Sequence, residues 1–201
     1  MNFPSLKKSH TILNQRIQGL YGITPDKDLN IDLIENAIKK HNIKILQYRR
    51  KAVNIKNKAE EAKQLLNLCL EHNTLFIVND DINLCQEVGA DGIHIGQDDM
   101  NLKSVREKLG DEFIIGVSCH NSLELALEAE LNGADYIALG TIFKSKNKPK
   151  AIQCTLSQVT EIKKNISIPI VGIGGINLKN QHFVYQAGCS SVAMIDGLFK
   201  E

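Results

Sequence analysis

The sequence lacks several features that would point to a membrane, secreted or nucleic-acid-binding protein. No apolar run among its 201 residues approaches the roughly 18 needed to span a bilayer, and residues 1–14 lack the continuous apolar stretch of a secretory signal. Lys and Arg number 24 against 23 Asp and Glu, so the totals indicate no nucleic-acid-binding surface. We therefore expect a cytoplasmic protein with neither nucleic-acid nor membrane partners.

The sequence also lacks the motifs of common metal and redox centres. Its five cysteines form no C-x-x-C pair, and its six histidines form no H-E-x-x-H or H-x-H motif. Scattered cysteines in a chain of this size are typical of buried thiols in a reducing cytosol. A metal site built from histidine or cysteine therefore has little support.

Short apolar runs alternate with longer stretches of helical period along almost the whole chain. Eight strands are predicted, at residues 20–24, 43–48, 75–79, 92–95, 114–118, 136–140, 168–174 and 191–195. Helices are predicted at residues 31–40, 55–72, 81–88, 102–109, 122–132, 156–165 and 178–187. Eight repeats favour an α/β fold of the (β/α)8 TIM barrel type over an open doubly wound sheet. No linker rich in Pro, Gly or Ser interrupts the pattern, so residues 1–201 are predicted to form one domain.

The two ends of the chain depart from a regular barrel. Only six residues follow the eighth strand, too few for a full covering helix, so the last helix is predicted to be truncated. Residues 1–18 form an N-terminal extension. Its segment 6–18 has some helical character, and we expect it either to fill the gap or to plug the lower mouth of the barrel.

Function in such a barrel is expected at the carboxyl ends of the strands. After the second strand, Gln47, Arg49 and Lys51 share one face because strand side chains alternate. Taken alone, these charges are better explained by an exposed basic turn. Asp80 and Asp99 follow the third and fourth strands, and two carboxylates facing each other there are suited to Mg²⁺.

A helix cap is the alternative role for aspartates at these strand ends. The sequence has Asp80-Asp81 after the third strand and Asp98-Asp99 after the fourth, and at least one of the four is expected to cap the helix that follows. Spacing alone does not decide which one does so.

The fifth strand ends in G-V-S-C-H, which lacks the final glycine of a G-x-S-x-G nucleophile elbow. Ser118 is therefore interpreted as a hydrogen-bonding residue. His94 and His120 are interpreted as packed or supporting side chains rather than catalysts.

Two loops on the same side of the barrel suit a phosphate. The lysine-rich loop at residues 144–150 either is solvated or folds over an anionic substrate. The Gly174-Gly175 turn after the seventh strand lies where such barrels commonly bind phosphate. Mg²⁺ brings two positive charges and Arg49, Lys51 and Lys148 bring three, while Asp80 and Asp99 remove two. The net charge of about +3 matches the roughly −3 of a bound diphosphate.

The ordered motifs closely resemble those of the thiamine-phosphate synthase family, from Leu20 to Ile195. They are Q-Y-R-R-K, F-I-V-N-D, G-A-D-G-I-H-I-G-Q-D-D, G-V-S-C-H, G-A-D-Y-I-A-L-G-T-I-F, P-I-V-G-I-G-G-I and S-V-A-M-I. The resemblance implies a (β/α) barrel transferase of thiamine biosynthesis. It would couple hydroxymethylpyrimidine diphosphate to thiazole (carboxythiazole) phosphate, releasing pyrophosphate by a dissociative, Mg²⁺-assisted reaction.

The resemblance also assigns roles to individual residues. It implies that Asp80 and Asp99 bind Mg²⁺ and that Arg49, Lys51 and Lys148 are catalytic, stabilising charge on the leaving group. The implied contacts to the pyrimidine diphosphate are Gln47, Arg49, Lys51, Asn79, Ser118 and Lys148. The implied thiazole phosphate positions are Ser145, Asn147, Gly175, Ile195 and Asp196.

The sequence departs from the family pattern at two of these positions. Asn147 replaces the second threonine of the usual T-x-T-K, and Asp196 replaces a small residue, so that its carboxylate would either repel the phosphate or cap the N–H groups that bind it. Two alternatives are a thiazole tautomerase-like isomerase and a non-catalytic phosphate-ligand sensor. A homo-oligomer is also possible.

Overall fold

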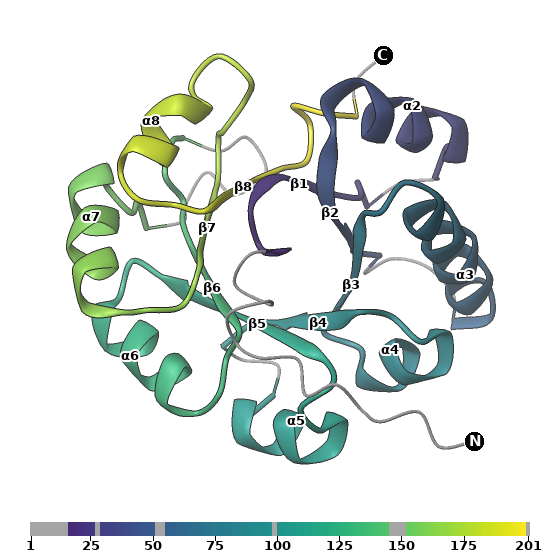
Figure 1. The fold of residues 1–201 in the computed structure, drawn as a ribbon, viewed down its shortest axis with the longest axis horizontal. Helices are drawn as coiled ribbons and strands as arrows, with labels where there is room; N and C mark the ends of the chain where they lie inside the picture. The colour runs from purple at the N-terminus through teal and green to yellow at the C-terminus, as the bar shows by residue number, and fades with distance from the viewer. Residues whose placement is uncertain (1–15, 27–28, 51–54, 98–99, 145–151, 200–201) are drawn as a thin grey trace.

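The computed structural model is a closed barrel of eight parallel strands that follow one another around the barrel in chain order. It describes residues 16–26, 29–50, 55–97, 100–144 and 152–199, and the side chains of residues 55 and 56 lie outside this description. Helices surround the barrel, and β8 pairs with β1 to complete the ring (Figure 1). The predicted TIM barrel is confirmed.

The helices and strands agree closely with the sequence pattern. The strands are β1 (Gly19–Ile23), β2 (Ile43–Tyr48), β3 (Leu75–Asn79), β4 (Gly92–Ile95), β5 (Ile114–His120), β6 (Tyr136–Leu139), β7 (Ile170–Ile173) and β8 (Ser191–Met194). The helices are α2 (Ile31–His41), α3 (Ile55–Glu71), α4 (Ile82–Val88), α5 (Leu102–Leu109), α6 (Leu123–Leu131), α7 (Leu156–Asn165) and α8 (Gln181–Gln186). Side-chain caps begin five of these helices, because an oxygen there accepts an otherwise unpaired backbone N–H. The caps are Asn30, Asp81, Asn101, Ser122 and Thr155.

Two elements begin more than one residue later than the sequence predicts. α8 begins three residues late, because the Asn177 side chain accepts hydrogen bonds from the backbone N–H groups of Lys179 and Asn180 and so forms a turn instead. β7 begins at Ile170 rather than at residue 168, because Pro169 has no N–H for the ladder. Glu130 of α6 moreover accepts hydrogen bonds from Ser167 and Ile168, which therefore do not pair with a strand.

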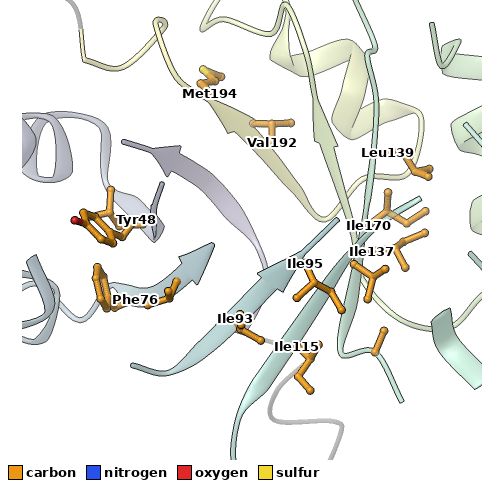
Figure 2. Close-up of a cluster of buried hydrophobic side chains, with 14 of the residues drawn as sticks. Tyr48, Phe76, Ile93, Ile95, Ile115, Ile137, Leu139, Ile170, Val192 and Met194 are labelled. Atoms are coloured by element: carbon orange, nitrogen blue, oxygen red, sulfur yellow. The ribbon is translucent and has the colours of Figure 1, made fainter. Parts of the chain in front are cut away.

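Alternation along the strands produces two separate hydrophobic cores. One lies inside the barrel and includes Tyr21, Ile45, Ile77 and Tyr136. The other lies between barrel and helices, where outward side chains such as Phe76 pack (Figure 2). All five cysteines are buried and unpaired, as predicted. The inner side chains that follow this alternation toward the carboxyl ends of the strands form the mouth of the barrel.

The two ends of the described chain pack against different cores of the barrel. Ile17 is fully buried in the inner core, and Arg16 lies 3.9 Å from Asp91 at the beginning of β4, so the chain enters across the lower mouth. After β8, Leu198 and Phe199 are buried in the outer core. Phe199 lies against Gly22 of β1, where a Cβ would come within 2.8 Å of its ring. Residues 6–15 of the predicted plug lie outside the described residues.

Candidate functional site

The inner face of the upper barrel is polar and carries several of the predicted site residues. Gln47 continues the inward series of Ile45 on β2, and Asn79 continues that of Leu75 and Ile77 on β3. Ser118 lies at the same end of β5. The fold therefore directs these three side chains into one mouth, as the strand alternation predicts.

The end of β2 separates its side chains into two groups. Tyr48 and Arg50 point outward and both bind Glu61 of α3, at 2.8 Å from the Tyr48 hydroxyl and 3.1 Å from Arg50 Nη2. Burial and the Glu61 carboxylate raise the pKa of Tyr48. Arg49 follows the inward face, and its Nη1 lies 3.9 Å from Asp26 Oδ2. Arg49 therefore lies on the side of the mouth, whereas Arg50 lies on the side of α3.

Asp80 and Asp81 have different roles after β3. Asp81 caps α4 by accepting a hydrogen bond from the Leu84 N–H at 3.0 Å, so at least one of the four aspartates is a helix cap, as expected. Asp80 has a positive φ of 61°, donates its N–H to the His94 carbonyl at 2.9 Å, and accepts through Oδ2 from the Asn79 amide. The structure thus brings Asn79 and Asp80 together.

A cleft of about 530 Å³ lies beside this strand end. Asn79 and Asp80 line it together with Arg50 after β2, Lys58 of α3 and Lys108 of α5. Its wall therefore carries both carboxylate and cationic side chains. The described residues that line it are Arg50, Lys58, Asn79, Asp80, Asp81, Ile82, Asn83, Met100 and Lys108.

A chain of hydrogen bonds crosses the barrel below the mouth. The Gln47 amide nitrogen lies 2.8 Å from the Tyr21 hydroxyl, which lies 3.0 Å from the Tyr136 hydroxyl. Tyr136 in turn lies 3.1 Å from His94 Nδ1, and His94 Nε2 lies 2.9 Å from Ser118 Oγ. Burial raises the pKa of both tyrosines, so both hydroxyls keep their protons at neutral pH. Two predicted site residues, Gln47 and Ser118, are thereby connected.

Sequence reasoning missed two members of this chain, Tyr21 and Tyr136. A usable signal was present, because each is a tyrosine on the inward face of a strand, and a buried tyrosine hydroxyl needs a partner. His94 was interpreted as a packed or supporting side chain, and it does pack against the Tyr136 ring, with centroids 5.6 Å apart.

The packing of the neighbouring loop explains why the turn after β7 consists of glycines. A Cβ at Gly174 would lie 2.7 Å from the Thr141 Cα, and one at Gly175 would lie 2.5 Å from the Lys144 carbonyl oxygen. Both glycines also have positive φ, which other residues rarely adopt. The loop after β6 thus approaches both glycines closely, which leaves no room for a side chain at either position. A phosphate role for Gly175 stays a prediction.

Ile195 and Asp196, two of the residues predicted to bind the thiazole phosphate, follow β8. Ile195 packs against the inner core, whereas Asp196 is exposed. Among the described residues, the Asp196 carboxylate accepts no hydrogen bond from a backbone N–H, so the capping alternative has no support there. Lys51, Asp99, Ser145, Asn147 and Lys148 lie outside the described residues.

The donor set at the end of β3 suits a hard cation. The carboxylate of Asp80 is half-buried on the wall of the cleft, beside the amide oxygen and nitrogen of Asn79. Oxygen ligands of this kind, supplemented by water and substrate phosphate, are those that Mg²⁺ takes. Within the described part of the chain, no three His, Cys, Asp or Glu side chains gather into a metal-binding group. An open site with carboxylate, water and substrate oxygens as ligands fits the preferences of Mg²⁺.

Comparison with known proteins identifies the family. Residues 20–198 match the TMP-TENI family, thiamine monophosphate synthase. The chain is 42% identical over 192 residues to the thiamine-phosphate synthase of Thioalkalivibrio sulfidiphilus, covering 94% of this chain and 91% of that one. It is 41% identical over 191 residues to the Nitrosococcus oceani thiamine-phosphate synthase, covering 94% and 88%.

A solved structure agrees with this result. The thiamine phosphate pyrophosphorylase from Pyrococcus furiosus superposes with a TM-score of 0.83 at 32% identity, covering 92% of this chain and 88% of that one. No helix in the described part of the chain has the length and apolar character of a membrane span. The chain belongs to the thiamine monophosphate synthase family.

Proposed function

We propose that this family member is a transferase that joins hydroxymethylpyrimidine diphosphate to thiazole (carboxythiazole) phosphate, forming thiamine phosphate and releasing pyrophosphate. The observation that carries the proposal is the 41–42% identity to thiamine-phosphate synthases over 94% of the chain. Those relatives are named for the synthase reaction, which favours it over a tautomerase-like isomerase or a sensor.

The mouth of the barrel has groups that suit such a coupling. Gln47 and Ser118 are proposed to orient the pyrimidine from opposite sides, and Arg49 is proposed to provide positive charge at the rim. The proposed dissociative reaction needs a stabilised leaving group and two aligned partners rather than a protein nucleophile. The enzyme's contribution is then to hold both substrates in line and to keep charge near the departing oxygens.

Mg²⁺ is the proposed cofactor, with Asp80 and Asp99 as its protein ligands. When bound, the metal supplies positive charge to the oxygens of the leaving pyrophosphate. Asn79 orients the Asp80 carboxylate through its amide. Lys51 and Lys148 are proposed to share the leaving group with Arg49. Ser145, Asn147, Gly175, Ile195 and Asp196 are proposed to hold the thiazole phosphate. We propose that the reaction takes place in the cytoplasm.

Incubation of the protein with both substrates, with Mg²⁺ or with a chelator, tests the proposal. Metal-dependent release of pyrophosphate together with thiamine phosphate is expected. Asp80→Asn is expected to lower kcat/KM on the order of 100-fold or more. Asp111→Asn is the matched control, since it makes the same change at an exposed aspartate between α5 and β5, at the opposite end of the barrel. Pyrophosphate release without thiamine phosphate, or equal activity of the two variants, would refute the proposal.

A further inference from the structure

The contact between His94 and Ser118 has the geometry of a base beside a nucleophile. His94 Nε2 lies 2.9 Å from Ser118 Oγ, and a serine in such a pair can be activated by losing its proton to the ring. Whether this happens depends on which ring nitrogen of His94 carries the proton. The other ring nitrogen, Nδ1, belongs to the chain of buried hydroxyls and is therefore constrained by it.

The protons of this chain can be assigned by following donors and acceptors. The Gln47 amide nitrogen can only donate, so Tyr21 accepts there and has its own proton left to give. Among the described residues its remaining partner is the Tyr136 hydroxyl, and Tyr136 in turn has only His94 Nδ1 left to receive its proton. Because both tyrosines are at most 1% exposed, neither hydroxyl can turn to water instead.

We propose that the chain Gln47–Tyr21–Tyr136–His94–Ser118 is polarised in one direction, so that His94 is neutral with its proton on Nε2 and donates to Ser118. Tyr21, Tyr136 and His94 are then positioning residues. Ser118 Oγ accepts from His94 and directs its own proton into the mouth, toward an acceptor atom of the pyrimidine substrate. Ser118 is therefore a hydrogen-bond donor and not a nucleophile.

The same chain fixes the other end of the site. The Gln47 amide uses one N–H on Tyr21, and among the described residues its Oε1 accepts no hydrogen bond, so the amide presents an acceptor to the mouth. The opposite polarity would require Gln47 to turn Oε1 toward Tyr21. It would then place the proton on His94 Nδ1 and make Nε2 a base for Ser118. The two polarities thus predict opposite tautomers of one histidine.

The tautomer can be measured on the ligand-free protein by long-range ¹H–¹⁵N NMR at neutral pH. His94→Gln identifies the His94 signals among the six histidines by their loss. Nδ1 is expected to resonate as an unprotonated nitrogen and Nε2 as a protonated one. A proton on Nδ1, an imidazolium or an averaged mixture of tautomers would overturn the proposal.

Two single-hydroxyl deletions form a matched pair for this measurement. Tyr136→Phe removes the donor to Nδ1 and is expected to release His94 into a mixture of tautomers. Tyr21→Phe deletes an equally buried hydroxyl but leaves the Tyr136–His94 bond, so the Nε2–H tautomer is expected to persist. A general loss of packing would change both variants alike. An unchanged Nε2–H tautomer in Tyr136→Phe would show that the Tyr136 hydroxyl does not set the position of the His94 proton, and a tautomer change in Tyr21→Phe would overturn the assignment of that role to the Tyr136–His94 bond.

The inference that Ser118 donates a hydrogen bond to the pyrimidine rests on the proposed function and is tested separately. Tyr136→Phe is expected to raise KM for the pyrimidine diphosphate about 3- to 10-fold, with KM for the thiazole phosphate changed less than about twofold. Equal effects on both substrates would overturn the positioning role. If the wild-type protein shows the Nε2–H tautomer but no synthase turnover, the proposed function fails while the polarity of the chain stands.

Discussion

Replacing Asp135 by alanine is expected to be strongly destabilising while leaving the mouth of the barrel intact. Asp135 precedes β6 at the end of the barrel opposite the site and is 4% exposed. Its Oδ2 lies 2.6 Å from Arg106 Nη2 and 2.8 Å from the Ile115 backbone nitrogen. Arg106 of α5 also donates to the carbonyls of Gly110, Phe113 and Gly133 at 2.8–2.9 Å. One ion pair thus connects α5, β5 and the loop before β6.

The size of the effect follows from what the substitution leaves behind. Removal of one partner from a buried ion pair costs about 3–5 kcal/mol, and an unpaired buried N–H costs about 1–3 kcal/mol. Arg106 keeps three carbonyl acceptors and its side chain is 18% exposed, which puts the loss at the lower end, about 3 kcal/mol. Asp135→Asn keeps an acceptor for Ile115 and is expected to cost about half as much.

Urea unfolding followed by circular dichroism and tyrosine fluorescence measures this loss. Glu87→Ala is the control, because Glu87 pairs with Lys63 at 3.4 Å with both side chains more than half exposed, and such a pair is worth about 0–1 kcal/mol. The kcat of Asp135→Ala, measured below its unfolding temperature, is expected to equal that of the wild type. If Asp135→Ala is no less stable than Glu87→Ala, the buried ion pair does not contribute as argued.

Three further predictions concern other parts of the molecule. Asp196→Ser is expected to tighten thiazole phosphate binding about fivefold by removing a like charge, and weaker binding in calorimetry would contradict this. Partial burial alone would raise the pKa of Glu130, but hydrogen bonds from Ser167 and Ile168 outweigh it and hold that pKa below 4.5. The ionised Glu130 carboxylate therefore stabilises the fold above pH 4.5, and this contribution is lost as the pH falls through the lowered pKa. In urea unfolding at decreasing pH, the difference in stability between the wild type and Glu130→Gln should disappear. A difference that stays constant with pH would refute this. Gly22→Ala places a Cβ 2.8 Å from Phe199 and should lower the free energy of unfolding by about 1–3 kcal/mol. Adding Phe199→Leu should restore part of this loss, as measured by thermal melts. If the double variant is no more stable than Gly22→Ala, the contact with Phe199 is not the cause.

Local pattern determined the elements and the direction of their side chains. The alternation in β2 was enough to place Gln47 inside the barrel, because the twofold period of a strand is a property of neighbouring residues. The outward direction of Tyr48 and Arg50 follows from the same period. The order of strands also followed, since short strand–helix repeats close in sequence order. The aspartate that caps α4 could not be chosen by spacing, because Asp80 and Asp81 are adjacent and only the backbone turn separates their roles.

The tertiary structure decided which inner side chains meet. Tyr21 and Tyr136 are 115 residues apart, and their hydroxyls touch only because the closed, tilted barrel brings β1 opposite β6. The glycines after β7 likewise have their reason in the loop after β6, and Phe199 covers β1 from the far end of the chain. Sequence periodicity describes the face of each strand but not the stagger between strands, and this stagger determines every contact across the barrel. The sequence therefore determined the barrel and the inward direction of side chains such as Gln47, whereas closure of the barrel decided how Gln47 and Ser118 are connected.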